Sequence, residues 1–427
     1  MHGASDIGRP ARPRLLILNL YMVHPPNSGA KVVIVNRLRE LSKAFEVTFC
    51  CLEESPTDRE GAGALRPFCD VVLASGLTRH ATSYPRSCLE QPCASEFATK
   101  LDAWFGSPEL RHLLTQRFDV VELHSSCWFR HELADVSGLK VLVAHNREVD
   151  YYRDRARVVR KAEGHVAGRR AARDAALVAR QERQAIAASD AVVSLAPLEP
   201  ADASAWFGSR PVLHNWGGVD LASYRDVQSG AAADEPGSGP VLVFIAAFFV
   251  AAAAEAAWRF VQDALPEILR IHPRARLRLV GDHRGHPRVV ALAAHPSVDV
   301  TGLVPDVRPH LAIADVVVVP IMHGSGVRYK LMEALAAGAS VVATGKAAEG
   351  LGLRTGHDAV LVETVRQMGP AVVDLLQDAA LRQGLSERAR ATASARFDHV
   401  AEHATLARWY YDQLREKGVS SDQTTPP

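Results

Sequence analysis

The stretch "VVVVPIMHGSGVRYKLMEALAAG", residues 316–338, decides the fold of this chain. Four consecutive valines followed by Pro320 predict a buried strand that ends at the proline. The apolar residues after it predict a helix over residues 327–337. A buried strand, a short glycine-containing loop and a helix together form one unit of a parallel α/β sheet.

The loop of this unit has the composition of an anion-binding site. Gly324 and Gly326 carry no Cβ, so backbone N–H groups there can approach a bound group closely. The N-terminus of the helix adds the positive end of its dipole, and Arg328 and Lys330 add two formal charges. Arg grips phosphate oxygens in pairs and Lys supplies a mobile point charge, so the pattern predicts a diphosphate site.

Glu333 lies among apolar residues of the same predicted helix. A buried carboxylate needs hydrogen-bond donors, and two sugar hydroxyls would satisfy both of its oxygens. Alternatively, the residue only stabilises the early helix through the dipole; the sequence leaves both interpretations open. A dinucleotide-binding motif is disfavoured, because Tyr329 stands where the third glycine of G-x-G-x-x-G belongs.

Similar units recur along the chain. Apolar, β-branched runs alternate with helical segments between residues 14 and 216 and again between residues 241 and 363. Residues 225–240, "RDVQSGAAADEPGSGP", lack an apolar period and have the composition of a linker. We therefore predict an α/β protein with two Rossmann-like, doubly wound domains that face each other across a cleft, where ligands bind beyond the strand ends.

The predicted N-terminal domain covers residues 1–228 and the C-terminal domain covers residues 238–397. Residues 398–418 contain a long amphipathic helix whose apolar and aromatic face needs a partner surface. The tail, residues 419–427, is polar, and we predict that it is disordered.

Composition excludes several classes of function. The chain has 49 basic and 48 acidic residues among 427, so net charge gives no support for nucleic-acid binding. Its six cysteines lie in the first third without the spacing of zinc ligands, which predicts buried thiols and no metal site. The N-terminus lacks the apolar core of a secretory signal, and the apolar run 241–254 is shorter than the roughly 20 residues that span a bilayer. We expect a cytosolic location.

Residues 151–184 are rich in arginine. The simpler interpretation is a solvated helical face; the alternative is peripheral contact with an anionic lipid surface, at the inner face of the membrane, or with an anionic acceptor.

Taken together, these segments resemble the family-four retaining glycosyltransferases, which have the GT-B architecture. The resemblance covers nearly the whole chain and is strongest over residues 300–320 and 324–351. It implies transfer of a glycosyl group from a nucleoside diphosphate sugar to an acceptor hydroxyl, with retention at the anomeric carbon and without a metal or other cofactor. Arg328, Lys330 and the helix N-terminus would stabilise the leaving diphosphate. No side-chain base is obvious, which suits a front-face mechanism.

The resemblance also implies the remaining site residues. Residues 24–42 look like the N-terminal loop that approaches the donor phosphate or the acceptor, and the helix with Trp409 and Tyr410 looks like the element that crosses back to the N-terminal domain. Two strand-end histidines are candidates for contacting the transferred sugar. The full set comprises His124, Arg328 and Lys330 as catalytic residues, Gly281, Gly324, Ser325, Gly326, Glu333 and His145 as donor-binding residues, and Asn27 and Gly29 in the N-terminal loop.

The chain departs from the family pattern at two places. The first of two glutamates usual in the family falls on Ser325, and Ala246 and Ala247 stand where a glycine-containing turn is usual. A methyl group there keeps the backbone away from a phosphate. A catalytically impaired binding or activator subunit is therefore an alternative to an active glycosyltransferase, and a nucleotide-sugar epimerase is a third. The sequence identifies neither donor nor acceptor; the acceptor classes left open are lipid-linked glycan, polysaccharide and secondary metabolite.

Overall fold

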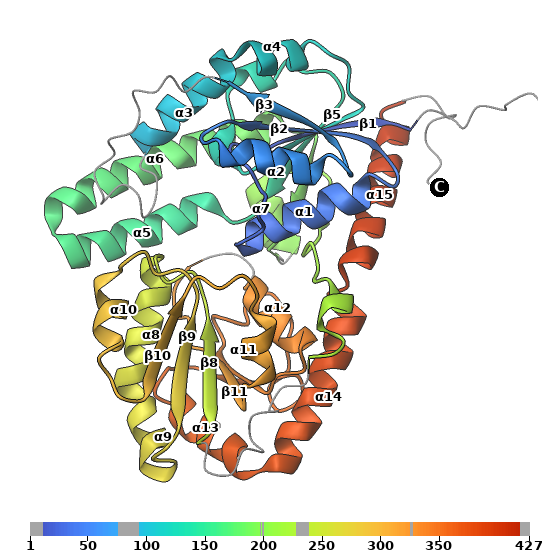
Figure 1. The fold of residues 1–427 in the computed structure, drawn as a ribbon. Coiled ribbons are helices and arrows are strands. Elements are labelled where there is room, and N and C mark those ends of the chain that lie inside the picture. The colour runs from blue at the N-terminus through green and yellow to red at the C-terminus, as the bar shows by residue number, and fades with distance from the viewer. Residues whose placement is uncertain are drawn as a thin grey trace, which may run out of the picture.

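The computed structural model describes residues 12–75, 94–196, 198, 200–227, 239–324 and 328–418. It contains two parallel sheets, each covered by helices, stacked along the long axis of the molecule (Figure 1). The strand orders are β3-β2-β1-β4-β5-β6-β7 and β10-β9-β8-β11-β12-β13. The direction of winding reverses between β1 and β4 and between β8 and β11, as in doubly wound folds. This confirms the predicted fold class.

The first sheet and its helices are built from the N-terminal half of the chain. Its strands are β1 (Arg14–Leu18), β2 (Glu46–Leu52), β3 (Asp70–Ala74), β4 (Val120–His124), β5 (Leu139–Ala144), β6 (Ala191–Ser194) and β7 (Val212–His214). Its α-helices are α1 (Gly29–Leu41), α2 (Thr57–Leu65), α3 (Ala94–Gly106), α4 (Pro108–Leu114), α5 (Glu148–Glu163), α6 (His165–Ala188) and α7 (Pro200–Phe207). Short 3₁₀ helices are η2 (Ser126–Trp128), η3 (His131–Leu133) and η4 (Leu221–Tyr224).

The second sheet follows after residue 239. Its strands are β8 (Val241–Ile245), β9 (Arg276–Val280), β10 (Val298–Gly302), β11 (Val316–Val319), β12 (Val341–Thr344) and β13 (Val360–Val362). The helices are α8 (Ala251–Asp263), α9 (Leu265–Ile271), α10 (Pro287–Leu292), α11 (Arg308–Ala312), α12 (Tyr329–Ala336), α13 (Met368–Gln377), α14 (Ala379–Arg396) and α15 (His399–Glu416).

Successive side chains of β1 enter two different cores. Leu15 and Ile17 belong to the core under α1, α2 and α15, whereas Leu16 and Leu18 belong to the core under α3, α4 and α6. All four are fully buried. A strand covered on both faces needs such a continuous apolar run.

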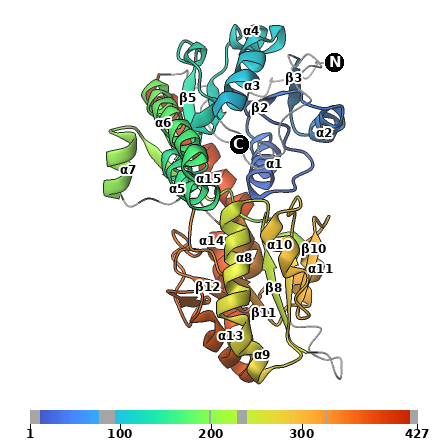
Figure 2. The same ribbon diagram turned by 90° about the vertical axis from the view of Figure 1, so that its left-hand side faces the viewer.

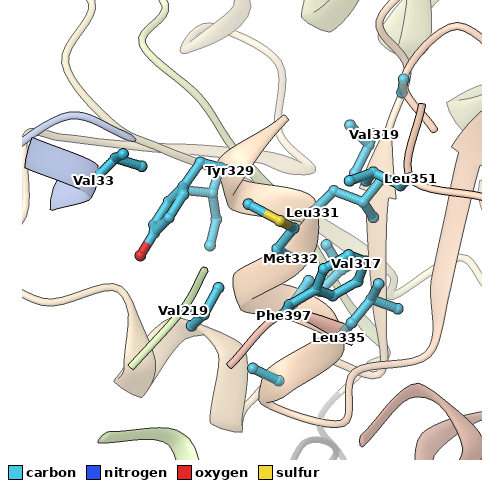
Figure 3. Packing of buried hydrophobic residues seen from close by; sticks show 14 of the residues in the cluster. Val33, Val219, Val317, Val319, Tyr329, Leu331, Met332, Leu335, Leu351 and Phe397 are labelled. Carbon is cyan, nitrogen blue, oxygen red and sulfur yellow. The ribbon is translucent and has the colours of Figure 1, made fainter. Parts of the chain in front are cut away.

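The segment that opened the sequence analysis folds as expected. β11 ends at Val319, directly before Pro320, and α12 begins at Tyr329, two residues later than predicted. Leu331 and Leu335 of α12 are fully buried in the cluster around this helix (Figure 3). Ser325, Gly326 and Val327 lie outside the described residues.

The chain crosses between the two sheets at two adjacent places, seen beside α14 and α15 in Figures 1 and 2. The Val219 N–H donates to the Phe397 carbonyl at 2.6 Å, and the His399 N–H donates to the Val219 carbonyl at 3.2 Å. A Cβ on Gly218, whose φ is +60°, would lie 2.4 Å from the His399 Cα, so the contact requires glycine. We call residues 218–219 and 397–399 the paired crossing. Beyond it, α15 packs against α1.

Four cysteines, Cys50, Cys51, Cys69 and Cys127, are buried free thiols as predicted, whereas Cys88 and Cys93 lie outside the described residues. The tail from residue 419 and most of the predicted linker, residues 228–238, also lie outside them. Within the described part of the chain, no helix is both long and apolar enough to cross a membrane. The apolar run at 241–254 instead forms β8 and the start of α8, as expected.

Candidate active site

A cavity of about 680 Å³, here called the central cavity, lies between the carboxyl ends of the two sheets. Residues from the β1–α1 loop line one side, and residues that follow β8, β9 and β10 line the other. The cavity brings together five of the residues singled out in the sequence: Asn27, Gly29, Gly281, Lys330 and Glu333.

The N-termini of two helices meet at this cavity. Gly29 is the first residue of α1, Tyr329 is the first residue of α12, and a Cβ on Gly29 would lie 2.8 Å from the Tyr329 Cβ. The glycine therefore allows one helix start to approach the other. Because both helices present free N–H groups and the positive ends of their dipoles, an anion is favoured where they converge.

Lysines from both helices line the central cavity. Lys31 lies in the first turn of α1, and Lys330 is the second residue of α12. Burial lowers the pKa of Lys31, and nearby acids, Asp58 first among them, oppose that shift. Acidic side chains and Arg284 also line the wall, so the charges around the cavity are mixed.

Glu333 is a buried residue with protein partners for both carboxylate oxygens. The Tyr224 hydroxyl donates to Oε1 at 2.6 Å, and Lys330 Nζ lies 2.7 Å from Oε2. Glu333 and Lys330 both line the cavity, so a bound ligand can compete for this ion pair. Neither Tyr224 nor its bond was expected from the sequence.

Gly281 allows the backbone after β9 to lie close to the backbone after β8. Its φ is +141°, and a Cβ there would lie 1.9 Å from the Ala246 carbonyl oxygen. Ala246 and Ala247 line the cavity beside it. The methyl groups of Ala246 and Ala247 therefore lie in the part of the wall where the resemblance led us to expect a glycine-containing turn.

Arg328 does not line the central cavity with Lys330. It precedes α12 and its Nη2 donates to the His323 carbonyl at 3.1 Å, over Gly324, whose φ is +102°. Burial lowers the pKa of Arg328, and Glu349 and Tyr151 oppose the shift. Gly324 instead lines a second cavity, of about 730 Å³, together with Arg147, Arg153, Arg157 and Lys346.

The two predicted histidines lie in a third, smaller cavity of about 130 Å³. His124, the last residue of β4, is fully buried, and both of its ring nitrogens have partners. Nε2 is 2.8 Å from Glu122 Oε2, and Nδ1 is 3.0 Å from His145 Nε2. Burial lowers the pKa of His124, although Glu122 opposes the shift, and burial and then His124 lower the pKa of His145. Both imidazoles are therefore neutral near pH 7.

A buried ionic network fixes this histidine pair. Arg37 Nη1 lies 3.1 Å from Glu122 Oε2, and the Tyr410 hydroxyl donates to Glu122 Oε1 at 2.6 Å. Burial favours the neutral form of Glu122, but Arg37, His124 and Tyr410 outweigh it and lower its pKa to about 2. The ionised Glu122 carboxylate accepts a hydrogen bond from the Nε2–H group of His124, so Nδ1 accepts a hydrogen bond from His145.

One feature of the sequence indicates this network: an acid, Glu122, lies inside an apolar strand two residues before His124. Arg37 lies on a predicted amphipathic helix and was not expected in the site, and Tyr410 was expected only as part of the helix that crosses back to the N-terminal domain.

The arginine-rich segment forms α5 and α6, which lie side by side (Figure 1). The basic side chains of these two helices are largely exposed, whereas three of the helices' acids, Glu148, Asp174 and Glu182, are buried. The outer face is therefore more basic than the sequence of the segment suggests. Among the described residues, no three His, Cys, Asp or Glu side chains are grouped as metal ligands would be.

Residues 239–378, from β8 to α13, match the family model described as "Glycosyl transferases group 1". No curated protein matches the chain. Solved structures share its fold over nearly the whole length. Sucrose-phosphate synthase from Thermosynechococcus elongatus has a TM-score of 0.70 at 15% identity, covering 95% of this chain and 100% of its own.

Two further structures are similar. HepE of Anabaena in complex with UDP and glucose has a TM-score of 0.61 at 13% identity, with 93% of this chain and 99% of that one covered. WaaG, a glycosyltransferase involved in lipopolysaccharide biosynthesis, has a TM-score of 0.59 at 15% identity, with the same coverage. These likenesses show the GT-B fold, and with the family match they support a glycosyltransferase of group 1.

Proposed function

We propose that this chain is an active family-four glycosyltransferase. It transfers a sugar from a nucleoside diphosphate sugar to an acceptor hydroxyl with retention at the anomeric carbon, and it needs no metal. The donor binds mainly to the C-terminal domain, residues 238–397, and the acceptor to the N-terminal domain, residues 1–228. The observation that carries the proposal is the convergence of the α1 and α12 N-termini on the central cavity, with Lys31 and Lys330 beside them.

The arrangement favours departure of a diphosphate. As the bond from the anomeric carbon to the diphosphate oxygen breaks, negative charge builds on the leaving group, and fixed dipoles and cations stabilise charge that develops in a shielded site. Lys330 can turn from Glu333 toward the diphosphate, because both residues face the cavity. Glu333 then has one oxygen free for a hydroxyl of the donor, while Tyr224 holds the other. UDP and UDP-glucose complexes of a protein with the same fold support a nucleotide-sugar donor.

Calorimetric titration with UDP, GDP, ADP and TDP tests the proposal. We expect one of them to bind wild type, and Lys330→Ala to weaken that binding at least tenfold, because a charge-assisted hydrogen bond contributes about 1.5–3 kcal/mol. Lys43→Ala is the matched control, since this exposed lysine lies outside the cavity. Arg328→Ala should cost less than Lys330→Ala, because Arg328 faces the His323 carbonyl. If no nucleoside diphosphate binds, or if Lys330→Ala binds as wild type does, the donor site is rejected.

Turnover separates the proposal from its alternatives. Purified protein is incubated with the donor whose diphosphate bound, alone and with a library of sugar, glycan and lipid-linked alcohols. A glycosylated product establishes transfer, and the configuration of the new linkage tests retention. Binding without any product supports an impaired subunit, for which the alanines at 246–247 are the structural reason. An altered sugar formed from donor alone indicates an epimerase.

We propose a cytosolic protein that touches the inner membrane face through the outer surface of α5 and α6. Arg169, Arg170 and Arg173 are exposed there, and Val166 is 85% exposed among them. Basic residues near an anionic surface contribute about 1 kcal/mol each. Co-sedimentation with phosphatidylglycerol vesicles at low salt, but not with phosphatidylcholine vesicles, is the expected result. Equal sedimentation with both, or with neither, argues against the contact.

A further inference from the structure

The central cavity contains a cation that the proposed function has not used. Arg284 follows β9, lines this cavity, and has a side chain that is 49% exposed. Among the described residues that line the cavity it is the one arginine, and the other two cations are Lys31 and Lys330. Arginine is the side chain that grips two phosphate oxygens at once. The sequence suggested this role for Arg328, which does not line the cavity.

The loop after β8 brings no charge of its own to the cavity. Residues 246–254 read "AAFFVAAAA", and the first charged residue after β8 is Glu255. Ala246, Ala247 and Phe249 line the cavity, just before the start of α8. This part of the wall offers backbone groups and the end of a helix dipole to an anion, but no cationic side chain. Any side-chain contact to an anion here therefore comes from a neighbouring loop.

Arg284 lies over this uncharged loop. Its guanidinium carbon is 4.0 Å from the centre of the Phe249 ring. The two loops are also joined through the backbone, because the Phe249 N–H donates to the Asp282 carbonyl at 3.1 Å. An arginine can pack on an aromatic ring and still donate hydrogen bonds through its N–H groups. The loop after β9 thus places a cation above the segment that has none.

The local backbone fixes Arg284 in this position. Its φ is +44°, a conformation that residues other than glycine rarely adopt. One carboxylate holds it there: the Arg284 N–H donates to Asp282 Oδ1 at 3.0 Å, and Nε donates to Oδ2 at 3.1 Å. The side-chain bond uses one of the five N–H groups of the guanidinium. The direction of the side chain is therefore set before any ligand binds.

A second cation faces Arg284 from the other half of the molecule. Lys31, in the first turn of α1, lines the same cavity. Burial lowers the pKa of Lys31, Asp58 opposes that shift, and the positive charge of Arg284 adds to it. The two cations therefore repel each other across the cavity, and an anion bound between them relieves the repulsion. A diphosphate offers one phosphoryl group to each cation.

We propose that Arg284 binds the diphosphate of the donor and stabilises it as the leaving group, together with Lys31 from the opposite half of the molecule. This inference deepens the proposed function and rests on it. The guanidinium donates N–H groups to phosphoryl oxygens in the bound donor. When the bond to the anomeric carbon breaks, the diphosphate keeps the electron pair, and the fixed positive charge of Arg284 stabilises the negative charge that develops.

This assignment offsets the departure from the family pattern after β8. The methyl groups of Ala246 and Ala247 occupy the wall, and the cation comes from the next loop instead. Phe249 and Asp282 are positioning residues, since they act on the diphosphate only through Arg284. The alanines are then compatible with an active enzyme.

The first test is calorimetric titration with the nucleoside diphosphate that binds wild type, starting with UDP. Arg284→Gln removes the charge, and we expect the Kd to rise at least about tenfold, which equals about 1.4 kcal/mol. Arg284→Lys keeps the charge but not the paired N–H groups, so its Kd should lie between the two. Arg288→Gln is the matched control, because Arg288 is 47% exposed and does not line the cavity. Its Kd should equal that of wild type.

A second titration shows which part of the ligand Arg284 contacts. Wild type and Arg284→Gln are compared with the diphosphate, the monophosphate and the free nucleoside of the same base, using ligand-observed NMR for weak binding. The loss should be largest for the diphosphate and absent for the nucleoside, and it should shrink at high salt, since the side chain is half exposed. An equal loss for the nucleoside places Arg284 at the base and overturns the inference.

Phe249→Leu tests the positioning role through a double-mutant cycle. It should weaken diphosphate binding in the wild-type background and have no further effect in Arg284→Gln, whereas a merely structural role gives equal losses in both. Circular dichroism should confirm that each variant is folded.

Two failures remain distinct. If wild type binds a nucleoside diphosphate and Arg284→Gln binds it equally well, or if Arg288→Gln loses as much affinity as Arg284→Gln, the inference is overturned and the proposed function stands. If wild type binds no nucleoside diphosphate, the proposed function itself is rejected.

Discussion

Tyr410→Phe tests whether α15 helps to build the histidine pair from the far end of the sequence. The substitution removes one hydroxyl, which donates to Glu122 Oε1 at 2.6 Å with both residues fully buried. The ring keeps its edge contact with Phe45. A hydrogen bond to a buried charge contributes about 1.5–3 kcal/mol, so we expect unfolding to become easier by about 2 kcal/mol at pH 7.

Tyr411→Phe is the control on the same helix. Its hydroxyl donates to the neutral Ala44 carbonyl at 3.0 Å, and its ring also packs on Phe45. Loss of a neutral hydrogen bond should cost about 1 kcal/mol. Urea unfolding followed by circular dichroism measures both variants against wild type.

The stability losses of Tyr410→Phe and Tyr411→Phe should differ in their dependence on pH. The pKa of Glu122 lies at about 2 in the folded protein against 4.5 as its ordinary value, so its charged partners stabilise the fold above pH 4.5, and that contribution is lost as pH falls toward 2. The loss in free energy of unfolding caused by Tyr410→Phe, relative to wild type, should therefore be largest at neutral pH and smaller in acid. The loss caused by Tyr411→Phe should not change with pH. Equal losses in the two variants at pH 7, or a Tyr410→Phe deficit independent of pH, would refute the reasoning.

Two further outcomes follow from contacts described above. A Cβ on Gly29 would meet Tyr329 at 2.8 Å, so Gly29→Ala should cost about 1–3 kcal/mol and weaken nucleoside diphosphate binding, whereas Gly63→Ala, which meets nothing within 4 Å on α2, should be neutral or slightly stabilising in thermal melts. The pKa values of Glu148 and Glu182 are raised to about 7 in the folded protein. Between pH 4.5 and 7 the folded state therefore keeps protons that the unfolded state has released. The free energy of unfolding should fall across this range by up to about 3 kcal/mol for each group. Melting temperatures of Glu148→Gln and Glu182→Gln across that range should therefore decline less with pH than those of wild type; parallel curves would contradict the assignment.

The fold could be predicted because its determinants are local. Each strand is a short apolar run bounded by polar or glycine residues, and the alternation with helices already requires a parallel sheet. The helix α12 begins two residues later than predicted. The exact first residue of a helix depends on the geometry of its cap, and the residue before α12, Arg328, forms no side-chain cap.

The site could be predicted only in part. The glycines and lysine of the central cavity belong to short motifs, whereas Arg37, Glu122 and Tyr410 are separated by 85 and 288 residues along the chain. No local pattern joins such residues, because their proximity is a property of the tertiary fold. Glu148, which lines the cavity of the histidine pair, was hidden for a related reason: it opens a segment in which most charges are exposed, and only the packing of α5 on α6 reveals that it is buried.

The paired crossing has a mechanical consequence. Two chain segments joined by backbone hydrogen bonds must bend together, so the halves of the molecule can rotate about that short double strand but cannot easily twist or slide past one another. Gly218 has no side chain, and its backbone lies in close contact with the backbone of His399. The two segments therefore have little room to move relative to each other on that side. Opening of the molecule should therefore be a hinge rotation of one half against the other about the paired crossing. The largest displacement should occur at the edge farthest from residues 218 and 398.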